Sequence, residues 1–383
     1  MANTLTNLAA DLHKAADTVG RESIGVISSC LLNANGSERV ALNDTVRSHF
    51  TRVPSASVAI TESMTIPQGT DQVVDSKTLS ITKAQSITIP WTGEDVKHVD
   101  NGAGFTTVYG DQILQGMRVL ANEIESDLAI EAYTNASRAF GTAGTTPFGS
   151  NFNEIAEVRQ ILVDNGCPMD MVSLVVNTAA GTNLRQLASL QKVNESGGDD
   201  MLRRGELLNL QSFSIKESAQ IPLHTIGTGA GYLINNVSNE VIGEETLTVD
   251  TGTGTIVVGD VITHASDSVN KYMVNTALTG GVTVVIGEPG LKIQADNNDA
   301  ITVGSAFTPN LAFHRNALEL AIRAPAMPEG GDAADDSMII QDPVSGLVFE
   351  VRSYKGYHKN MFEIGVAYGF KAWKPQHIAV LLG

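Results

Sequence analysis

A long run of alternating apolar and polar residues, Val53 to Trp91, constrains the fold of this chain more than any other feature. Apolar side chains recur at every second position in four pairs: Val58 and Ile60, Met64 and Ile66, Leu79 and Ile81, and Ile87 and Ile89. A period of two predicts strands, and the polar stretch IPQGTDQ predicts a turn between them. We therefore expect one extended hairpin. Because an isolated two-stranded ribbon is marginal in water, we expect it to lie on another surface, such as a second subunit.

Helical spacing is found on both sides of this hairpin. Leu5, Leu8 and Leu12 recur at nearly helical intervals, which predicts an amphipathic N-terminal helix. That helix folds onto its own domain or, alternatively, packs as an arm on a neighbouring subunit. From Thr107 to Phe140 the apolar positions follow helical steps, and this pattern predicts one long amphipathic helix.

Mixed patterns follow the long helix. A second helix is predicted to open at Asn151, with Glu154 completing a capping box and Ile155, Val158 and Leu162 on its buried face. The segment MVSLVVN then predicts a short buried strand, and PNLAFHRNALELAIRAP predicts either helix or a mixture of strand and helix. The fold class expected for this host part of the chain is therefore α+β.

Between these parts, Tyr232 to Thr308 has almost no helical periodicity. It consists of short β-branched runs such as TLTVD, GTIVVGDVITH and GVTVVIG, separated by turn pairs that contain glycine, proline or asparagine. Short strands with frequent turns predict a small β-barrel or sandwich. We interpret this segment as an all-β unit inserted into the α+β host.

The stretch HTIGTGAGY, residues 224–232, places Gly227, Gly229 and Gly231 just before the β segment. Glycine-rich loops bind phosphate where a strand feeds the N-terminus of a helix. Here a strand is predicted before the glycines and no helix after them. We therefore interpret the glycines as one seam of the insertion, where the backbone leaves the host, and expect the matching seam near Pro309.

Composition narrows the classes of function. The 383 residues include 42 acidic and 25 basic side chains, a formal net charge of −17, so the overall field repels nucleic-acid backbones and disfavours a sequence-reading DNA-binding protein. Cys30 and Cys167 have no paired spacing, which predicts neither a disulfide framework nor a zinc site. No signal-peptide core or membrane-length apolar window is present, and we expect a soluble protein.

No motif predicts catalysis, a cofactor or a metal. The eight histidines are too widely spaced for paired ligand motifs, and no serine lies in a nucleophile elbow. The acidic stretch EGGDAADDS is typical of a solvated turn and is too short for a calcium loop. We therefore expect a protein that is not an enzyme and has no catalytic, cofactor-binding or metal-ligating residues.

The order of these elements resembles the major capsid, or coat, proteins of tailed bacteriophages. The resemblance covers essentially the whole chain and includes the C-terminal stretch from GLVFEVRSYKGYHKN to HIAVLL. Its most specific part is the run Phe313-His314-Arg315-Asn316-Ala317, which is similar to a run found where the core resumes in the coat-protein branch of the short-tailed Salmonella phages. That branch adds an inserted domain to the Hong Kong 97 shell fold.

The resemblance implies a division of the chain into six parts. These are an N-arm at 1–52, an extended loop (E-loop) at 53–100, a peripheral (P) domain with its spine helix at 101–150, the first part of an axial (A) domain at 151–225, the inserted β domain at 226–308, and the completion of both host domains at 309–383. Some relatives join hairpin lysines covalently to asparagines, but for Lys77 and Lys83 we favour ordinary solvated side chains.

The resemblance also implies a function. We expect a structural subunit that assembles into an icosahedral shell of hexamers and pentamers around double-stranded DNA, without sequence-specific binding and without a membrane. Contacts between subunits are expected at Leu5, Leu8, Leu12, Val58, Ile60, Ile87 and Ile89. Further expected partners are a separate scaffolding protein and a portal, and the expected location is the virion capsid after synthesis in the bacterial cytoplasm. The alternatives are a tail-tube or decoration protein, or an enzyme with a β accessory domain.

Overall fold

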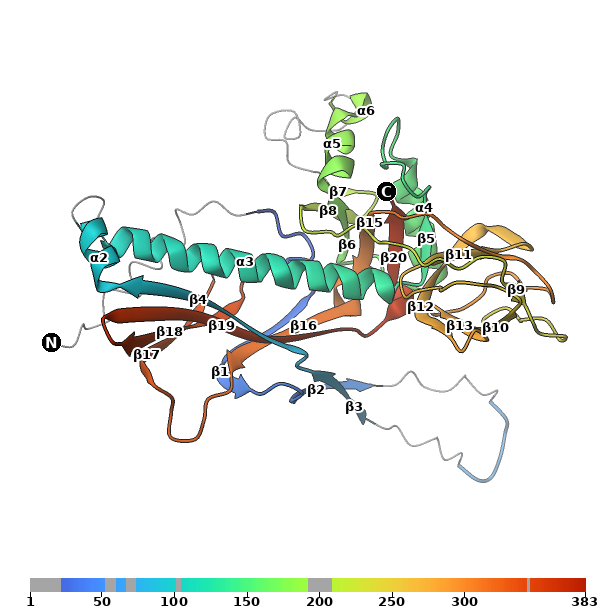
Figure 1. Ribbon diagram of the computed structural model, residues 1–383. Coiled ribbons are helices and arrows are strands. Elements are labelled where there is room, and N and C mark those ends of the chain that lie inside the picture. The colour runs from blue at the N-terminus through green and yellow to red at the C-terminus, as the bar shows by residue number, and fades with distance from the viewer. Residues whose placement is uncertain (1–21, 52–59, 67–73, 101–104, 192–208, 343–344) are drawn as a thin grey trace.

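The computed structural model describes residues 22–51, 60–66, 74–100, 105–191, 209–342 and 345–383. Its largest single element is the helix α3 (Phe105–Thr134), which lies along one face of a six-stranded sheet (Figure 1). The strands of this sheet are β1 (Leu31–Val40), β16 (Leu318–Pro325), β19 (Lys359–Ala372), β18 (Val348–Gly356), β17 (Ala334–Gln341) and β4 (Lys83–Thr92). Strand β19 pairs with β4 along one edge and with β18 and then β16 along the other.

The predicted apolar stripe of α3 faces this sheet. Ile113, Met117, Leu120, Ile124 and Leu128 are all buried in one core with side chains of β16, β18 and β19. The helix was expected to continue to Phe140 but ends at Thr134. The correction has a physical cause, because β5 (Arg138–Phe140) pairs with two other strands and its backbone is satisfied there instead.

A second sheet of twelve strands forms the other half of the protein. Its host strands are β7 (Asn209–Leu210), β8 (Phe213–Ser218), β6 (Val172–Asn177), β15 (Pro309–His314), β20 (Ile378–Leu382) and β5. The sheet continues from β5 through β12 (Asp267–Thr279), β13 (Thr283–Ile286), β10 (Thr246–Asp250) and β9 (Leu233–Ile234). Strand β11 (Val261–His264) pairs with β12, and β14 (Ile301–Val303) pairs with β11. The protein is thus of mixed α and β structure, as expected.

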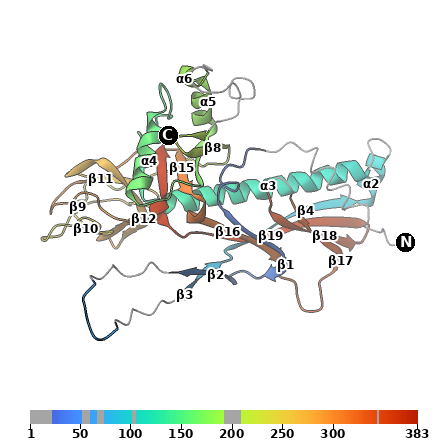
Figure 2. The ribbon, with the colours of Figure 1, turned by 180° about the vertical axis from the view of Figure 1, so that it is seen from behind.

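Short helices cover the host part of this sheet. They are α4 (Asn153–Asp164), α5 (Thr178–Gln186) and α6 (Ala188–Gln191), while α2 (Gly93–Asp100) lies at the far end of α3 (Figure 2). Helix α4 buries Ile155, Val158 and Leu162 as predicted. The capping box was wrong, since the N-cap is Phe152 and its side chain makes no capping bond.

Residues 309–325 contain no α-helix, which corrects the expected mixture of strand and helix. Strand β15 and strand β16 are joined by a single 3₁₀ turn, η2 (Arg315–Ala317). Both strands are buried along almost their whole length, so their near-continuous apolar character reflects strands covered on both faces.

The segment from Tyr232 to Thr308 contains strands and no helix, in agreement with the pattern of its sequence. It has a separate core in which Tyr232, Leu247, Tyr272 and Ile286 are buried. It is nevertheless continuous with the host, because Lys271 and Tyr272 of β12 pair with Ala139 and Arg138 of β5.

The expected hairpin is only partly the hairpin of the structure. Its paired strands are β2 (Thr45–Thr51) and β3 (Val74–Ser80), and the described residues 60–66 between them form no strand. Strand β4, which carries Ile87 and Ile89, belongs to the main sheet. Leu79 and Ile81 are buried against Ala321 and Ala367 of that sheet, so a deletion of the whole predicted hairpin would remove part of the core.

Candidate functional site

The two most exposed apolar side chains of the described chain, Met64 and Ile60, lie between β2 and β3. Relative to a free side chain, Ile60 is 101% exposed, Met64 is 105% exposed and Ile66 is 86% exposed. Both ribbon views show residues 60–66 at the outer end of an extension, away from the rest of the described chain (Figures 1 and 2). An apolar segment held out in water has the character of a contact surface. We call residues 60–66 the apolar tip.

The other predicted contact residues have different environments. Leu5, Leu8, Leu12 and Val58 lie outside the described residues. Ile87 and Ile89 are half-buried against the protein's own core, because β4 pairs with β19 along its full length. Of the predicted contact residues in the described part of the chain, Ile60 alone is fully exposed.

The base of the extension is fixed to the main sheet by apolar and cationic contacts. Leu79 of β3 is buried in a small apolar cluster, and Val46 of β2 and Trp373, which follows β19, both pack against that cluster. The ammonium group of Lys77 lies 5.1 Å from the centroid of the Trp373 ring. Lys83 forms an ion pair with Asp127 of α3 at 2.7 Å. Neither lysine is simply solvated, which corrects the expectation from sequence. Their partners, Trp373 and Asp127, are distant in the sequence, so the local pattern of residues does not reveal them.

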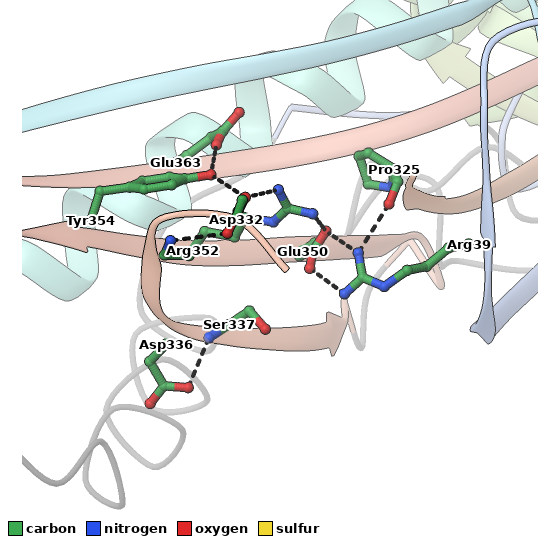
Figure 3. A network of polar contacts seen from close by, with 10 residues as sticks. Arg39, Pro325, Asp332, Asp336, Ser337, Glu350, Arg352, Tyr354 and Glu363 are labelled. Carbon is green, nitrogen blue, oxygen red and sulfur yellow. Dashed lines mark hydrogen bonds and ion pairs between the residues drawn. The ribbon is translucent and has the colours of Figure 1, made fainter. Parts of the chain in front are cut away.

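A network of charged groups joins β1 to β18 (Figure 3). The carboxylate of Glu350, whose side chain is 1% exposed, accepts hydrogen bonds from Arg39 at 2.5 and 2.9 Å and from Arg352 at 2.9 Å. Arg352 also pairs with Asp332 at 2.8 Å, and the hydroxyl of Tyr354 lies 2.9 Å from Glu363. Burial alone would lower the pKa of Arg352, but its hydrogen bonds to Glu350 and Tyr354 raise it above its ordinary value.

Sequence reasoning missed this network. A usable signal was present in FEVRSY, where alternation puts Glu350, Arg352 and Tyr354 on one face of a strand. Their partners come from distant parts of the chain, and no local pattern identifies Arg39 or Asp332. The network holds β1, the first strand of the described chain, against β18 and has a structural role. We call the ion pairs of Glu350 with Arg39 and Arg352 the clasp.

The glycine-rich stretch lies against the protein's own carboxylate. The main-chain N–H of Gly227 lies 3.2 Å from both oxygens of Asp260, which also accepts from Val257 at 2.8 Å. The Nε2 atom of His224 lies 2.9 Å from the same carboxylate, and Asp260 is completely buried. The group that this loop binds is therefore an internal aspartate.

The two predicted seams of the β segment are neighbours in space. His224 and Phe307 form an isolated bridge, with the N–H of His224 donating to the carbonyl of Phe307 at 2.9 Å. Pro309 opens β15 two residues later and pairs with Leu382. This geometry is compatible with an insertion whose ends are adjacent, and the assignment of Gly227, Gly229, Gly231 and Pro309 as its seams stays a proposal.

The described residues contain no group of three or more His, Cys, Asp or Glu side chains that could hold a metal. Burial raises the pKa of Cys30 to about 12 and that of Cys167 to about 11, so neither thiol is an activated nucleophile. A pocket of about 430 Å³ lies beside α4 and β12, and one of about 160 Å³ lies beside Glu350 and Glu363. Neither lining contains a histidine or a cysteine. In the part of the chain that the structure describes, no helix is both long and apolar enough to span a bilayer.

Comparison with known proteins gives distant structural similarities. No family model and no curated protein matches the chain. A structure from Mycobacterium phage Che8 is similar at 14% identity and a TM-score of 0.48, covering 95% of this chain and 93% of that chain. The capsid structure of the cyanophage P-SCSP1u is similar at 11% identity and a TM-score of 0.49, covering 95% and 89%. The capsid of a native GTA particle is similar at 11% identity and a TM-score of 0.44, covering 95% and 91%. These identities and TM-scores describe a distant structural similarity.

Proposed function

We propose that this protein is the major capsid protein of a tailed bacteriophage, a structural subunit that assembles with copies of itself into a closed shell around double-stranded DNA. The observation that carries the proposal is the apolar tip. Ile60, Met64 and Ile66 are held away from the body by a ribbon whose base is fixed by buried residues. Within the described part of the chain, these side chains are left exposed to water.

The energetics favour a contact with another copy. Burying a large apolar side chain stabilises a contact by about 1.5–3 kcal/mol relative to leaving it in water. Three such side chains make a modest contact for one pair of subunits, but a shell repeats the contact at every subunit. Weak individual contacts that are repeated in this way are suited to assembly by a closed symmetry.

The domain assignment follows the sequence resemblance. We propose that 1–52 is the N-arm, 53–100 the E-loop, 101–150 the P domain with α3 as its spine helix, 226–308 the inserted domain, and 151–225 with 309–383 the remaining host domains in a Hong Kong 97-type fold. The long helix on a sheet, the outstretched segment between β2 and β3, and the separate core of the β segment support this division.

The partners belong to the same proposal. The net charge of −17 suits a shell lining that does not adhere to packaged DNA, so we propose DNA contact without sequence reading. A separate scaffolding protein and a portal are proposed from the resemblance alone. The proposed location is the virion capsid, after synthesis in the cytoplasm of the bacterial host.

The variant Ile60→Ser/Met64→Ser/Ile66→Ser tests the proposal. We expect a folded protein with an unchanged thermal unfolding midpoint, because these side chains are almost fully exposed. We also expect at least about tenfold fewer shells in negative-stain electron microscopy. The matched control Met171→Ser/Val237→Ser/Val269→Ser removes three other exposed apolar side chains and is expected to retain shells.

Normal shells from the tip variant would contradict the role of the apolar tip in assembly. Two other outcomes would contradict the proposed function itself. Rings or tubes from the wild-type protein would favour a tail-tube or decoration protein, and catalytic turnover by the monomer would favour an enzyme.

A further inference from the structure

A group of lysines surrounds Trp373 at the base of the ribbon. The ammonium groups of Lys77 and Lys371 lie 5.1 and 5.0 Å from the centroid of the indole ring. Lys374 is the next residue in the chain, and Lys371 and Lys374 are both exposed. We call Lys77, Lys371, Trp373 and Lys374 the Trp373 cluster. In a chain with a net charge of −17, such a concentration of positive charge is unusual.

The described carboxylates near Lys371 and Lys374 are engaged in other contacts. Glu319 already accepts a hydrogen bond from the Trp373 indole at 2.6 Å and another from Asn33 at 3.1 Å. Glu131 accepts from the N–H of Ala372, and burial raises its pKa, which disfavours its charged form. Glu288 is exposed and acts on Lys77.

The lysines also repel one another. Burial lowers the pKa of Lys77 first, and the charges of Lys374 and Lys371 lower it further, against the opposite effect of Glu288. A cation held against like charges gains from the approach of an anion. The Trp373 cluster therefore has the electrostatic character of a docking surface for a carboxylate-rich partner.

The chain itself contains such a partner. Residues 329–336, EGGDAADD, include four carboxylates and no base. Asp332 is held by Arg352, and Asp335 pairs with Lys355 on the surface, where both side chains are about half exposed. Among the described residues, Glu329 and Asp336 have no ion-pair partner. We call residues 329–336 the acidic loop.

The two features are too far apart to meet within one subunit. The acidic loop is fixed to β18 through the contact between Asp332 and Tyr354, and Tyr354 pairs with Met361 on β19. Lys371 lies ten residues further along the same strand, roughly 33 Å away at about 3.3 Å per residue. A second copy of the chain can place its acidic loop where the first copy cannot.

We propose that the Trp373 cluster of one subunit binds the acidic loop of a second copy of this chain. The inference rests on the proposed assembly into shells and names one of its contacts. Complementary patches of this kind set the orientation of subunits that otherwise repel one another, and they are weakened by salt because they are exposed.

A charge swap tests the contact. Lys371→Glu/Lys374→Glu is expected to reduce sedimenting particles at least about tenfold, because it faces the acidic loop with like charge. Glu329→Lys/Asp336→Lys is expected to have the same effect. The chain that carries all four substitutions restores opposite charges and is expected to recover particles to within about twofold of wild type.

The matched control Lys97→Glu/Lys359→Glu changes the net charge by the same amount on exposed residues elsewhere and is expected to assemble. Failure of the four-substitution chain to recover, when each pair alone abolishes assembly, would overturn the proposal.

A second measurement does not depend on particles. Concentrated wild-type protein, mixed from ¹⁴N- and ¹⁵N-labelled chains, is treated with a carbodiimide that joins amines to carboxylates in direct contact. We expect mixed-isotope peptides that join Lys371 or Lys374 to Glu329 or Asp336. If shells form and these peptides are absent, the contact is wrong; if the peptides form without shells, the contact stands and the proposed function is wrong.

Discussion

At the scale of single residues, Asp260 explains what the glycine-rich stretch does. Its buried carboxylate accepts from the main chain of Gly227 and Val257 and lies against His224. A side chain at Gly227 would overlap the carbonyl of Thr255, so this residue permits a close approach of two backbones. Through Asp260, the glycine-rich stretch therefore joins the β segment to His224, which precedes that segment in the chain.

Gly227→Ala is predicted to destabilise the protein by about 1–3 kcal/mol, because the new methyl group meets main-chain atoms that cannot move aside. Chemical denaturation measures the change. Gly149→Ala is the control, since that position is exposed and has open space around it, and a change within about 0.5 kcal/mol is expected there. Equal stabilities for the two variants would contradict the role assigned to Gly227.

Sequence reasoning at this scale recognised that the glycines are not a phosphate loop, because no helix follows them. It did not find Asp260, which lies more than thirty residues further along the chain. The same limit applies to Arg39 and Glu350. Local spacing reveals which side chains share a face, whereas ion pairs between distant segments depend on how the strands are ordered in the sheet.

At the scale of elements, the clasp between β1 and β18 is the clearest test of what holds the main sheet together. Glu350→Ala is predicted to cost about 3 kcal/mol, because it leaves the guanidinium groups of Arg39 and Arg352 without their shared carboxylate. Asp335→Ala removes an acid from an exposed pair and is predicted to cost less than about 1 kcal/mol. Thermal unfolding followed by circular dichroism compares the two. A larger loss from Asp335→Ala would contradict the assignment of the clasp.

The contact between the end of β15 and the start of β20 is predicted to make stability depend on pH. Burial lowers the pKa of His377 from 6.5 to about 4, and Lys374 and His314 contribute in the same direction. His314 has Asp170 on its other side, 3.9 Å away, and its own pKa is lowered by burial. As the pH is lowered, His377 therefore takes up a proton at a higher pH in the unfolded chain than in the folded protein. The free energy of unfolding falls as the pH drops from about 6.5 to 4.

His377→Gln is predicted to make this acid dependence shallower, since glutamine takes up no proton. The measurement is the free energy of unfolding in denaturant at several pH values between 7 and 4, and the slope is compared so that any packing loss cancels. His98→Gln, at an exposed position on α2, is expected to leave the wild-type slope unchanged. An unchanged slope in His377→Gln would contradict the proton linkage.

The elements also show where a sequence pattern reaches its limit. The period-two run from Val53 to Trp91 correctly predicted strands at β3 and β4, but it did not reveal that β3 pairs with β2 while β4 pairs with β19. Alternation specifies which face of a strand is buried and leaves its partner open. Helix α3 was easier to predict because its apolar stripe is a local property, and its end was misplaced because β5 is held by tertiary pairing.

At the scale of the whole molecule, the mixed α and β class and the helix-free segment 232–308 followed from changes in periodicity along the chain. The continuous sheet that joins this segment to its host did not follow from the sequence, because it depends on two residue pairs between β5 and β12. The proposed assembly surface was predictable only in part. Ile60 was expected at a contact, while the lysines around Trp373 are brought together by folding.

Negative-stain electron microscopy of purified wild-type protein, concentrated in stages, tests the central claim most directly. The proposed function predicts closed shells of uniform size that become more numerous with protein concentration, because each added subunit covers an apolar tip that water otherwise surrounds. Monomers alone at every concentration, or open rings and tubes in place of closed shells, would contradict it.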